Sequence, residues 1–170
     1  MKNIFLGFII LCAVGISCSK KDTACTFNDS TVTAPASETT NVETYLSTAG
    51  ITAAQKHPSG FYYKITQAGT GKAVVNLCSD VTVKYSGRLA SGTYFDPTTP
   101  GTTSLASFIL GKVIVGWQKG VPLISEGGKI TLYIPPSLGY GNVNVPNNGQ
   151  PVIIPANSIL IFDIELVSVN

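Results

Sequence analysis

Apolar and polar residues alternate along most of the chain after residue 60. The apolar positions are Phe61, Tyr63 and Ile65, then Val81, Val83, Tyr85 and Leu89, then Ile130, Leu132 and Ile134, and finally Leu160, Phe162, Ile164 and Leu166. A period of two is typical of strands with one buried and one solvated face, as in antiparallel sheets. The pattern therefore predicts an antiparallel sheet whose apolar face must be covered by another element.

Two segments have helical spacing instead. In residues 116–124, Trp117, Val121 and Ile124 form an apolar stripe, and Pro122 should keep the helix short. In residues 40–46 a second short helix is expected, with Gly50 as its stop signal. The predicted fold class is α+β, with a bent antiparallel β-sheet wrapped around one short α-helix and preceded by a short helical N-terminal segment.

The pattern of the first residues predicts a sorting signal rather than a folded element. Lys2 precedes an apolar run over residues 4–16, which is shorter than the roughly 20 residues that span a bilayer. Residues 15–18 resemble the processing site of a bacterial lipoprotein, with Cys18 as the lipidated residue, although a soluble secreted protein is the alternative. We expect a lipoprotein signal peptide over residues 1–17, a tether with a short helix over 18–59, and the main domain over 60–170. The expected location is the bacterial cell envelope, with attachment to a membrane through the lipid anchor.

The remaining cysteines predict one disulfide. Removal of Cys12 with the signal peptide and lipidation of Cys18 leave Cys25 and Cys78. Two thiols in an exported chain suggest a bridge between them. A zinc site is the rival, but two Cys and one His provide fewer than four ligands. The part of the tether before residue 36 is expected to be ordered only where Cys25 fixes it.

Composition narrows the class of function. The 170 residues carry a formal net charge of +2, and only 12% are charged, which argues against a nucleic-acid-binding surface. His57 is the only histidine, which weakens any catalytic triad and excludes multi-histidine metal sites. Phosphate-binding glycine motifs are absent from the sequence, which argues against a nucleotide cofactor. From these two observations we expect neither a metal nor a cofactor.

Five ordered blocks carry a resemblance to a known family. They are residues 83–89, 92–96, 108–117, 134–141 and 154–166. In this order they resemble the signature of the FKBP-type peptidyl-prolyl cis-trans isomerases. Taken singly, Trp117 or Tyr85 would be read as an ordinary core aromatic. The joint match is what favours a functional interpretation.

The resemblance implies an aromatic pocket and a role for each residue in it. The catalytic set would be Tyr85, Phe95, Asp96, Ile114, Trp117, Tyr140 and Phe162, and the substrate-binding set Phe108, Val113 and Ile154. Trp117 would form the floor. The backbone N–H of Ile114 and the hydroxyl of Tyr140 would hold carbonyl groups of the ligand, and Asp96 would be the carboxylate that points inward.

The sequence also departs from the family pattern. Many members have an Arg shortly after the pocket Asp, whereas residues 97–107 contain none. Ala106 stands where a further pocket aromatic is usual, and Phe108, two residues later on the same strand face, is a possible substitute. Residues 142–152 are expected to be a loop over the pocket, without the aromatic or His that some members carry.

These observations predict a prolyl isomerase that acts on X-Pro bonds of exported or envelope proteins. Its partners would be unfolded or loop-exposed proline-containing chains, with macrolides as possible inhibitors, no nucleic acid and a monomeric state. A catalytically weak chaperone or peptide-binding module using the same pocket is the main alternative. A surface-glycan-binding domain is a weaker one, and it would need exposed aromatics outside the pocket, chiefly Tyr62 and Tyr133.

Overall fold

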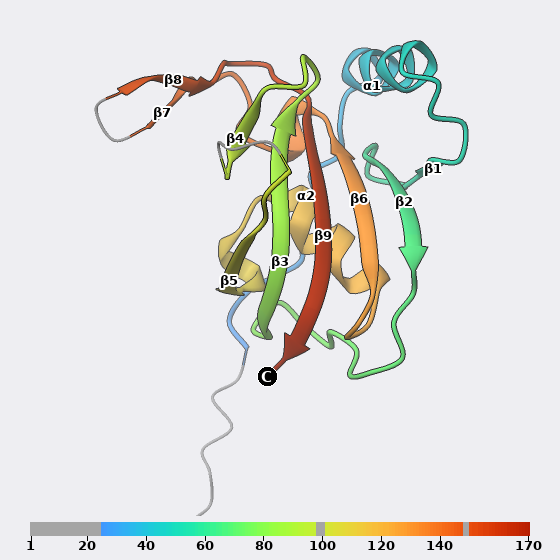
Figure 1. Cartoon of the computed structure of the whole chain (residues 1–170), viewed down its shortest axis with the longest axis vertical. Helices are drawn as coiled ribbons and strands as arrows, with labels where there is room; N and C mark the ends of the chain where they lie inside the picture. Colours follow the sequence, from blue (N-terminus) through green and yellow to red (C-terminus); the bar gives the residue numbers. More distant parts are fainter. Residues whose placement is uncertain (1–24, 98–100, 148–149) are drawn as a thin grey trace, which may run out of the picture.

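An antiparallel sheet of seven strands forms the centre of the protein, as seen in a computed structural model that describes residues 25–97, 101–147 and 150–170 (Figure 1). The strand order is β1-β2-β6-β9-β3-β4, and β5 also pairs with β3. The strands are β1 (Gln55–Lys56), β2 (Tyr62–Gln67), β3 (Asp80–Leu89), β4 (Tyr94–Asp96), β5 (Ser104–Ile109), β6 (Lys129–Ile134) and β9 (Leu160–Val169). This arrangement confirms the predicted antiparallel sheet. The predicted signal peptide and Cys18 lie outside the described residues.

The long strands β3 and β9 form the middle of the sheet. Their register runs from Val81 opposite Val169 to Leu89 opposite Leu160. The alternating side chains of β3, β6 and β9 point into one core, where Val83, Leu132 and Leu166 are fully buried. Alternation in the sequence therefore identified both the strands and the face that each of them buries.

One short helix covers one face of the sheet, as predicted. Helix α2 (Val115–Gly120) continues into the 3-10 turn η2 (Val121–Leu123) and crosses behind the sheet in Figure 1. Trp117, Val121 and Ile124 are all buried, which confirms the apolar stripe. A Cβ atom at Gly120 would lie 2.7 Å from Leu132, so the absence of a side chain there lets α2 lie directly on β6.

A longer helix covers the upper part of the opposite face. Helix α1 (Ala36–Thr48) buries Val42 and Leu46 against Tyr62, Tyr133 and Ile161 (Figure 1). Because of this cover, Tyr62 and Tyr133 are only 8% and 4% exposed. The expectation that both tyrosines face solvent is wrong, and the glycan-binding alternative loses its exposed aromatics.

Strand β2 also departs from the predicted alternation at its far end. Ile65 was expected on the buried face but is 38% exposed. Only the two-residue β1 flanks β2 on its outer side, so the later residues of β2 extend beyond the elements that cover the core. Periodicity therefore predicted the strand correctly but not the extent of its burial.

The N-terminal segment is fixed to the domain at several points. Cys25 and Cys78 form the predicted disulfide. The ring of Phe27 packs against Gly111, and the Ala34 amide donates a hydrogen bond to Ser59 O over 2.8 Å. The expectation that this segment is ordered only at Cys25 was therefore too narrow.

Short elements complete the fold around one end of the sheet. They are the 3-10 turns η1 (Leu110–Lys112) and η3 (Pro136–Leu138) and the strands β7 (Val145–Asn147) and β8 (Gln150–Ile154). Strands β7 and β8 form a separate hairpin where a loop was expected, because their backbones pair with each other rather than with the main sheet. In the described part of the chain, no helix has the length and apolar character needed to cross a membrane.

Candidate functional site: an aromatic pocket beside the short helix

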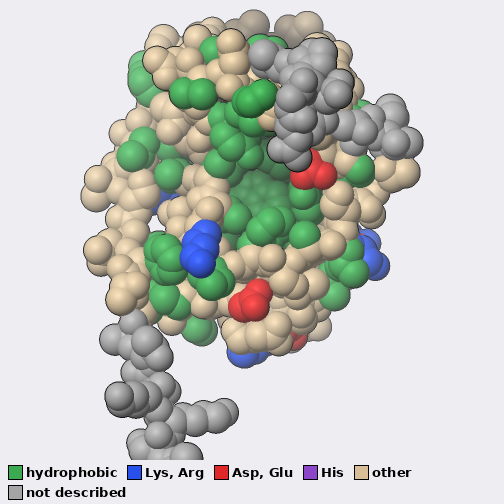
Figure 2. Space-filling model, turned by 90° about the vertical axis from the view of Figure 1, so that its left-hand side faces the viewer, with side chains coloured by type: hydrophobic (Ala, Val, Ile, Leu, Met, Phe, Trp, Pro, Cys, Tyr) green, Lys and Arg blue, Asp and Glu red, His purple; other side chains and the backbone are tan. Residues whose placement is uncertain are grey.

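A pocket of about 730 Å³ opens on the side of the domain where η1, α2 and the β7–β8 hairpin meet the sheet. Figure 2 shows it as a hollow lined with hydrophobic side chains. Its walls come from segments far apart in the sequence, including β3, β4, β5, β9 and the segment after η3. The fold therefore gathers the predicted blocks around one cavity.

All ten residues expected in the pocket line it: Tyr85, Phe95, Asp96, Phe108, Val113, Ile114, Trp117, Tyr140, Ile154 and Phe162. Four further lining residues were not predicted, namely Pro97, Lys112, Pro146 and Ile153. Pro97 and Lys112 adjoin predicted residues in the sequence, so neighbourhood could have suggested them. Pro146 and Ile153 enter because the paired strands β7 and β8, which carry them, reach the pocket.

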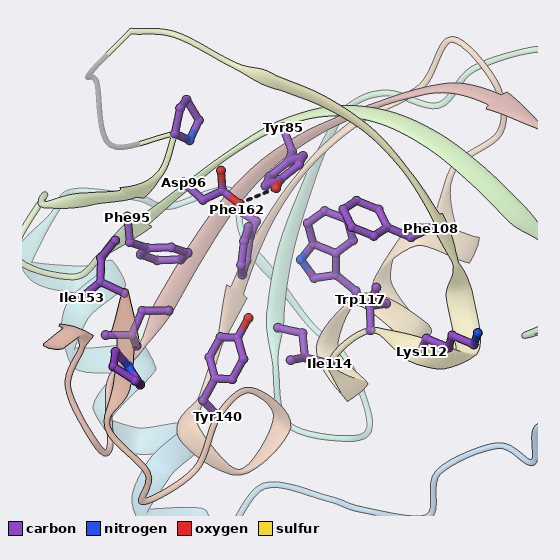
Figure 3. Close-up of a pocket in the computed structure, with 14 residues that line it drawn as sticks. Tyr85, Phe95, Asp96, Phe108, Lys112, Ile114, Trp117, Tyr140, Ile153 and Phe162 are labelled. Atoms are coloured by element: carbon purple, nitrogen blue, oxygen red, sulfur yellow. Dashed lines mark hydrogen bonds between the residues drawn. The ribbon is translucent and has the colours of Figure 1, made fainter. Parts of the chain in front are cut away.

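The indole of Trp117 forms the floor (Figure 3). It makes edge-to-face contacts with Tyr85 and Phe162, with ring centroids 5.2 Å apart in each pair. Trp117 is 4% exposed, and its Nε1 is buried without a hydrogen-bond partner in the described part of the chain. Edge-to-face contacts are favourable aromatic geometries, so the rings fix one another in place.

Phe108 occupies the wall near the position where the family aromatic is missing. Its ring lies edge-on to Trp117 at 5.7 Å and to Tyr85 at 6.0 Å. Ala106 lies two residues earlier on the same face of β5 and leaves that space to larger neighbours. The structure therefore places Phe108 where it can act as the substitute aromatic.

Asp96 is the one carboxylate among the residues that line the pocket. Tyr85 donates a hydrogen bond from its hydroxyl to Asp96 Oδ2 (Figure 3). Ser104 donates a second one to Asp96 Oδ1 over 3.1 Å. Burial, followed by the hydrogen bond to Asp96, raises the pKa of the Tyr85 phenol above its ordinary value. Tyr85 therefore stays protonated and remains a donor at neutral pH.

Ser104 was missed in the sequence, although one signal for it exists. Ser104, Ala106 and Phe108 alternate along β5, so all three share a face. The register then places Ser104 directly opposite Tyr85 on β3. A search for polar residues on the same strand face as Phe108 could have found it.

Two hydrogen-bond donors are available at the edge of the pocket. The Tyr140 hydroxyl points into the cavity (Figure 3), and burial together with the nearby Asp96 raises its pKa, so it stays protonated. Within residues 25–97, 101–147 and 150–170, neither this hydroxyl nor the Ile114 N–H has a hydrogen-bond partner. Both can therefore bind a carbonyl oxygen of a ligand.

Helix α1 contributes to the position of Tyr140. The Ser137 amide in η3 donates a hydrogen bond to Glu38 Oε2 over 2.9 Å, and η3 leads directly to Tyr140. The neighbouring Pro136 and Leu138 are buried. The segment that carries Tyr140 is thus fixed both by the core and by a residue 99 positions earlier in the chain.

The pocket offers binding and desolvation rather than nucleophilic chemistry. Its surface is mostly aromatic and aliphatic, with hydroxyl and amide donors at defined points. No group of three or more His, Cys, Asp or Glu side chains that could hold a metal occurs among the described residues. Such a site can take up an apolar ring and hold the carbonyl groups on either side of it.

Comparison with known proteins identifies the same family signature. Residues 71–167 match the model of the family described as FKBP-type peptidyl-prolyl cis-trans isomerase. The chain is 43% identical over 115 residues to the isomerase FkpA of Buchnera aphidicola from Schizaphis graminum, a match covering 68% of this chain and 43% of the relative. It is 42% identical over 112 residues to Escherichia coli FkpA, covering 66% of this chain and 38% of that protein. The chain therefore spans less than half the length of these curated relatives.

Solved structures support the fold independently. The crystal structure of FkpA from Escherichia coli superposes with a TM-score of 0.64 at 36% identity, covering 79% of this chain and 60% of that one. The crystal structure of AtFKBP13 gives a TM-score of 0.57 at 33% identity, covering 68% of this chain and 97% of that one. The overall fold is therefore the one these proteins share.

Proposed function

Because the chain belongs to the FKBP-type peptidyl-prolyl cis-trans isomerase family, we propose that its pocket catalyses the cis-trans isomerisation of X-Pro peptide bonds in polypeptides. The observation that carries the proposal is the convergence of all ten expected residues on one apolar cavity with Trp117 at its floor. Macrolides that occupy such pockets are expected to compete with the peptide.

The chemistry required of the pocket is modest. Rotation about a peptide bond faces a barrier of about 18–20 kcal/mol because resonance gives the C–N bond partial double-bond character. Twisting the bond removes that resonance and makes the amide less dipolar. An apolar cavity therefore disfavours the planar form more than the twisted form, which lowers the barrier.

The polar groups of the pocket would assist by holding the twisted substrate. With the proline ring over Trp117, the Tyr140 hydroxyl and the Ile114 N–H would donate to carbonyl groups on either side of it. Each contact that is stronger in the transition state lowers the barrier, and about 1.4 kcal/mol gives a tenfold faster reaction. Asp96 would act indirectly, because its carboxylate positions the Tyr85 hydroxyl and ring.

The test is an exchange measurement on a short X-Pro peptide by NMR, with and without the protein. We expect wild-type protein to accelerate the exchange and Tyr140→Phe to reduce kcat/KM while leaving the melting temperature unchanged. Trp117→Ala should abolish the acceleration, and a circular dichroism spectrum checks that this variant folds. Unaltered exchange with folded wild-type protein would contradict the proposal.

A peptide-binding module without turnover is the second candidate. The observation that favours it is the environment of Asp96, whose carboxylate is bound by two neutral hydroxyls and by no Arg from residues 97–107. Fluorescence of Trp117, the only tryptophan, reports binding directly. Binding of proline peptides without accelerated exchange would select this candidate.

We further infer that the protein is exported to the bacterial cell envelope and anchored there through lipidated Cys18, as a monomer. The apolar run at residues 4–16 and the cysteine after it support this inference, and the Cys25–Cys78 disulfide fits an oxidising compartment. Mass spectrometry of the protein from membranes should show acyl chains on Cys18, and Cys18→Ala should release the protein from the membrane. Light scattering of the protein without residues 1–18 tests the monomeric state.

A further inference from the structure

Of the described residues that line the pocket, two are charged, Asp96 and Lys112. They lie on opposite sides of it, Asp96 beside Phe95 and Lys112 on the side of Phe108 (Figure 3). We propose that Lys112 selects substrates with an acidic residue within two positions of the proline. This inference rests on the proposed prolyl isomerase function and names the class of sequence that the same pocket prefers.

The backbone of Lys112 is held firmly at the rim. The Gly111 amide donates to Leu77 O over 2.7 Å. The Gln118 side-chain amide donates to Gly111 O over 3.3 Å and to Val113 O over 2.8 Å, so the residues on both sides of Lys112 are held by one side chain. The point from which the lysine side chain extends is therefore fixed relative to the pocket floor.

The ammonium group of Lys112 has no counter-charge in the described part of the protein. The ion pairs there join Lys56 to Glu43, Arg88 to Asp163 and Lys129 to Glu165, and none involves Lys112. The pocket carboxylate, Asp96, is bound by Tyr85 and Ser104 on the other side. A positive charge on an exposed side chain therefore remains available at the edge of an apolar cavity, where it can attract an anion.

The position of Lys112 suits contact with the chain that flanks a bound proline. It lies directly before Val113 and Ile114, which line the rim, and five residues before Trp117 at the floor. A bound peptide must leave the cavity across its rim, and each extended residue advances about 3.3–3.6 Å. An acidic side chain one or two residues from the proline can therefore reach the flexible lysine side chain.

The test compares peptides that carry Glu, Gln or Lys immediately before the proline or two residues after it. In wild-type protein, kcat/KM for the Glu peptide should exceed that for the Gln peptide by about two- to fivefold at one of these positions, as expected for one partly exposed ion pair. The Lys peptide should be the poorest. The preference should disappear near 1 M salt, where the screening length is about 3 Å.

Variants of Lys112 distinguish the effect of its charge from the effects of the other pocket residues. Lys112→Gln should remove the preference for Glu, and Lys112→Glu should invert it toward the Lys peptide. Lys64→Gln, an exposed lysine on the distant strand β2, is the matched control and should leave the preference intact. Equal rates for the Glu and Gln peptides at both positions, or a preference that survives in Lys112→Gln, would overturn the proposal.

The two proposals can fail separately in this experiment. Turnover of the neutral Gln peptide tests the isomerase function, whereas the ratio of Glu to Gln peptide tests Lys112. If no peptide is turned over, Trp117 fluorescence still measures the ratio of dissociation constants. An equal affinity for the Glu and Gln peptides would then overturn the role of Lys112 on its own.

Discussion

The Ser104 hydroxyl lies 3.1 Å from Asp96 Oδ1 and donates a hydrogen bond to it, while the Tyr85 hydroxyl occupies the other oxygen of the same carboxylate. Two neutral donors therefore hold the pocket carboxylate, and no Lys or Arg among the described residues forms an ion pair with it. Since Tyr85 also contacts Trp117 through its ring, the carboxylate is linked through one side chain to the floor of the pocket.

Ser104→Ala should lower kcat/KM for a proline peptide by about three- to tenfold, because the loss of one hydrogen bond costs on the order of 1 kcal/mol. Ser104→Thr keeps the hydroxyl and suits a strand, so it should retain most of the activity. NMR exchange rates at matched protein concentration provide the measurement. Equal activity of Ala and Thr variants would show that Ser104 does not position Asp96.

The ten predicted site residues differ from Ser104 in their position relative to the blocks that resemble the family signature. Each of the ten lay in or beside a block whose order along the chain resembles a family signature. Ser104 lies between two blocks, and its partner Asp96 is eight residues away across residues 97–103. Their proximity follows only from the register of β5 and β4 on β3, which pairs Ser104 with Tyr85 and Asp96 with Gly87.

Phe108→Ala should weaken peptide binding, because this ring supplies the wall beside Trp117 and Tyr85. We expect KM to rise about five- to tenfold with a smaller change in kcat, since the lost contact is present before and during bond rotation. Phe108→Leu keeps an apolar side chain of similar reach, so its KM should lie between those of wild type and Phe108→Ala. A change in kcat alone would place Phe108 in a different role.

Burial was predicted correctly for side chains that the sheet packs into its own core. It was predicted less well for side chains that a separate segment, such as helix α1, covers. Alternation located β3, β6 and β9, because each buries one face in the same core. It misjudged Tyr62 and Tyr133, because the burial of these rings depends on Val42 and Leu46 of α1, which are distant in the sequence. Short-range patterns contain no information about which face a remote helix covers.

Gly111→Ala should destabilise the protein through a contact with the N-terminal segment. A Cβ atom at Gly111 would lie 2.4 Å from the ring of Phe27, so the ring or the η1 turn must shift. Overpacking of this kind costs about 1–3 kcal/mol. In a Phe27→Ala background the same substitution should cost less than half as much, since the clashing ring is gone. Urea denaturation of the four proteins in this cycle measures the difference, and equal costs in both backgrounds would mean that Phe27 does not pack on η1 in solution.

The last prediction concerns the pH dependence of stability, which the single histidine makes simple to interpret. The Ser59 amide donates a hydrogen bond to His57 Nδ1 over 3.1 Å, and the ring stacks on Phe61 with centroids 4.4 Å apart. Partial burial, and then the nearby Lys119, lower the pKa of His57 below its ordinary value of 6.5. The fold therefore favours the neutral imidazole, whose Nδ1 can accept this hydrogen bond.

A histidine pKa that is lower in the folded state means that the unfolded chain binds the proton first as the pH falls. The contribution of His57 to stability should therefore be complete above about pH 6.5 and decline as the pH falls from there through the folded-state pKa. As the pH is lowered from about 7.5 to 5.5, the melting temperature of wild type should fall. The melting temperature of His57→Asn should change less over this range. The side-chain oxygen of Asn can accept the same hydrogen bond from the Ser59 amide. Most carboxylates titrate below this range, so they add little to the difference. A wild-type melting temperature that rises toward pH 5.5 would require a protonated imidazole in the folded protein and would contradict the hydrogen bond to Nδ1.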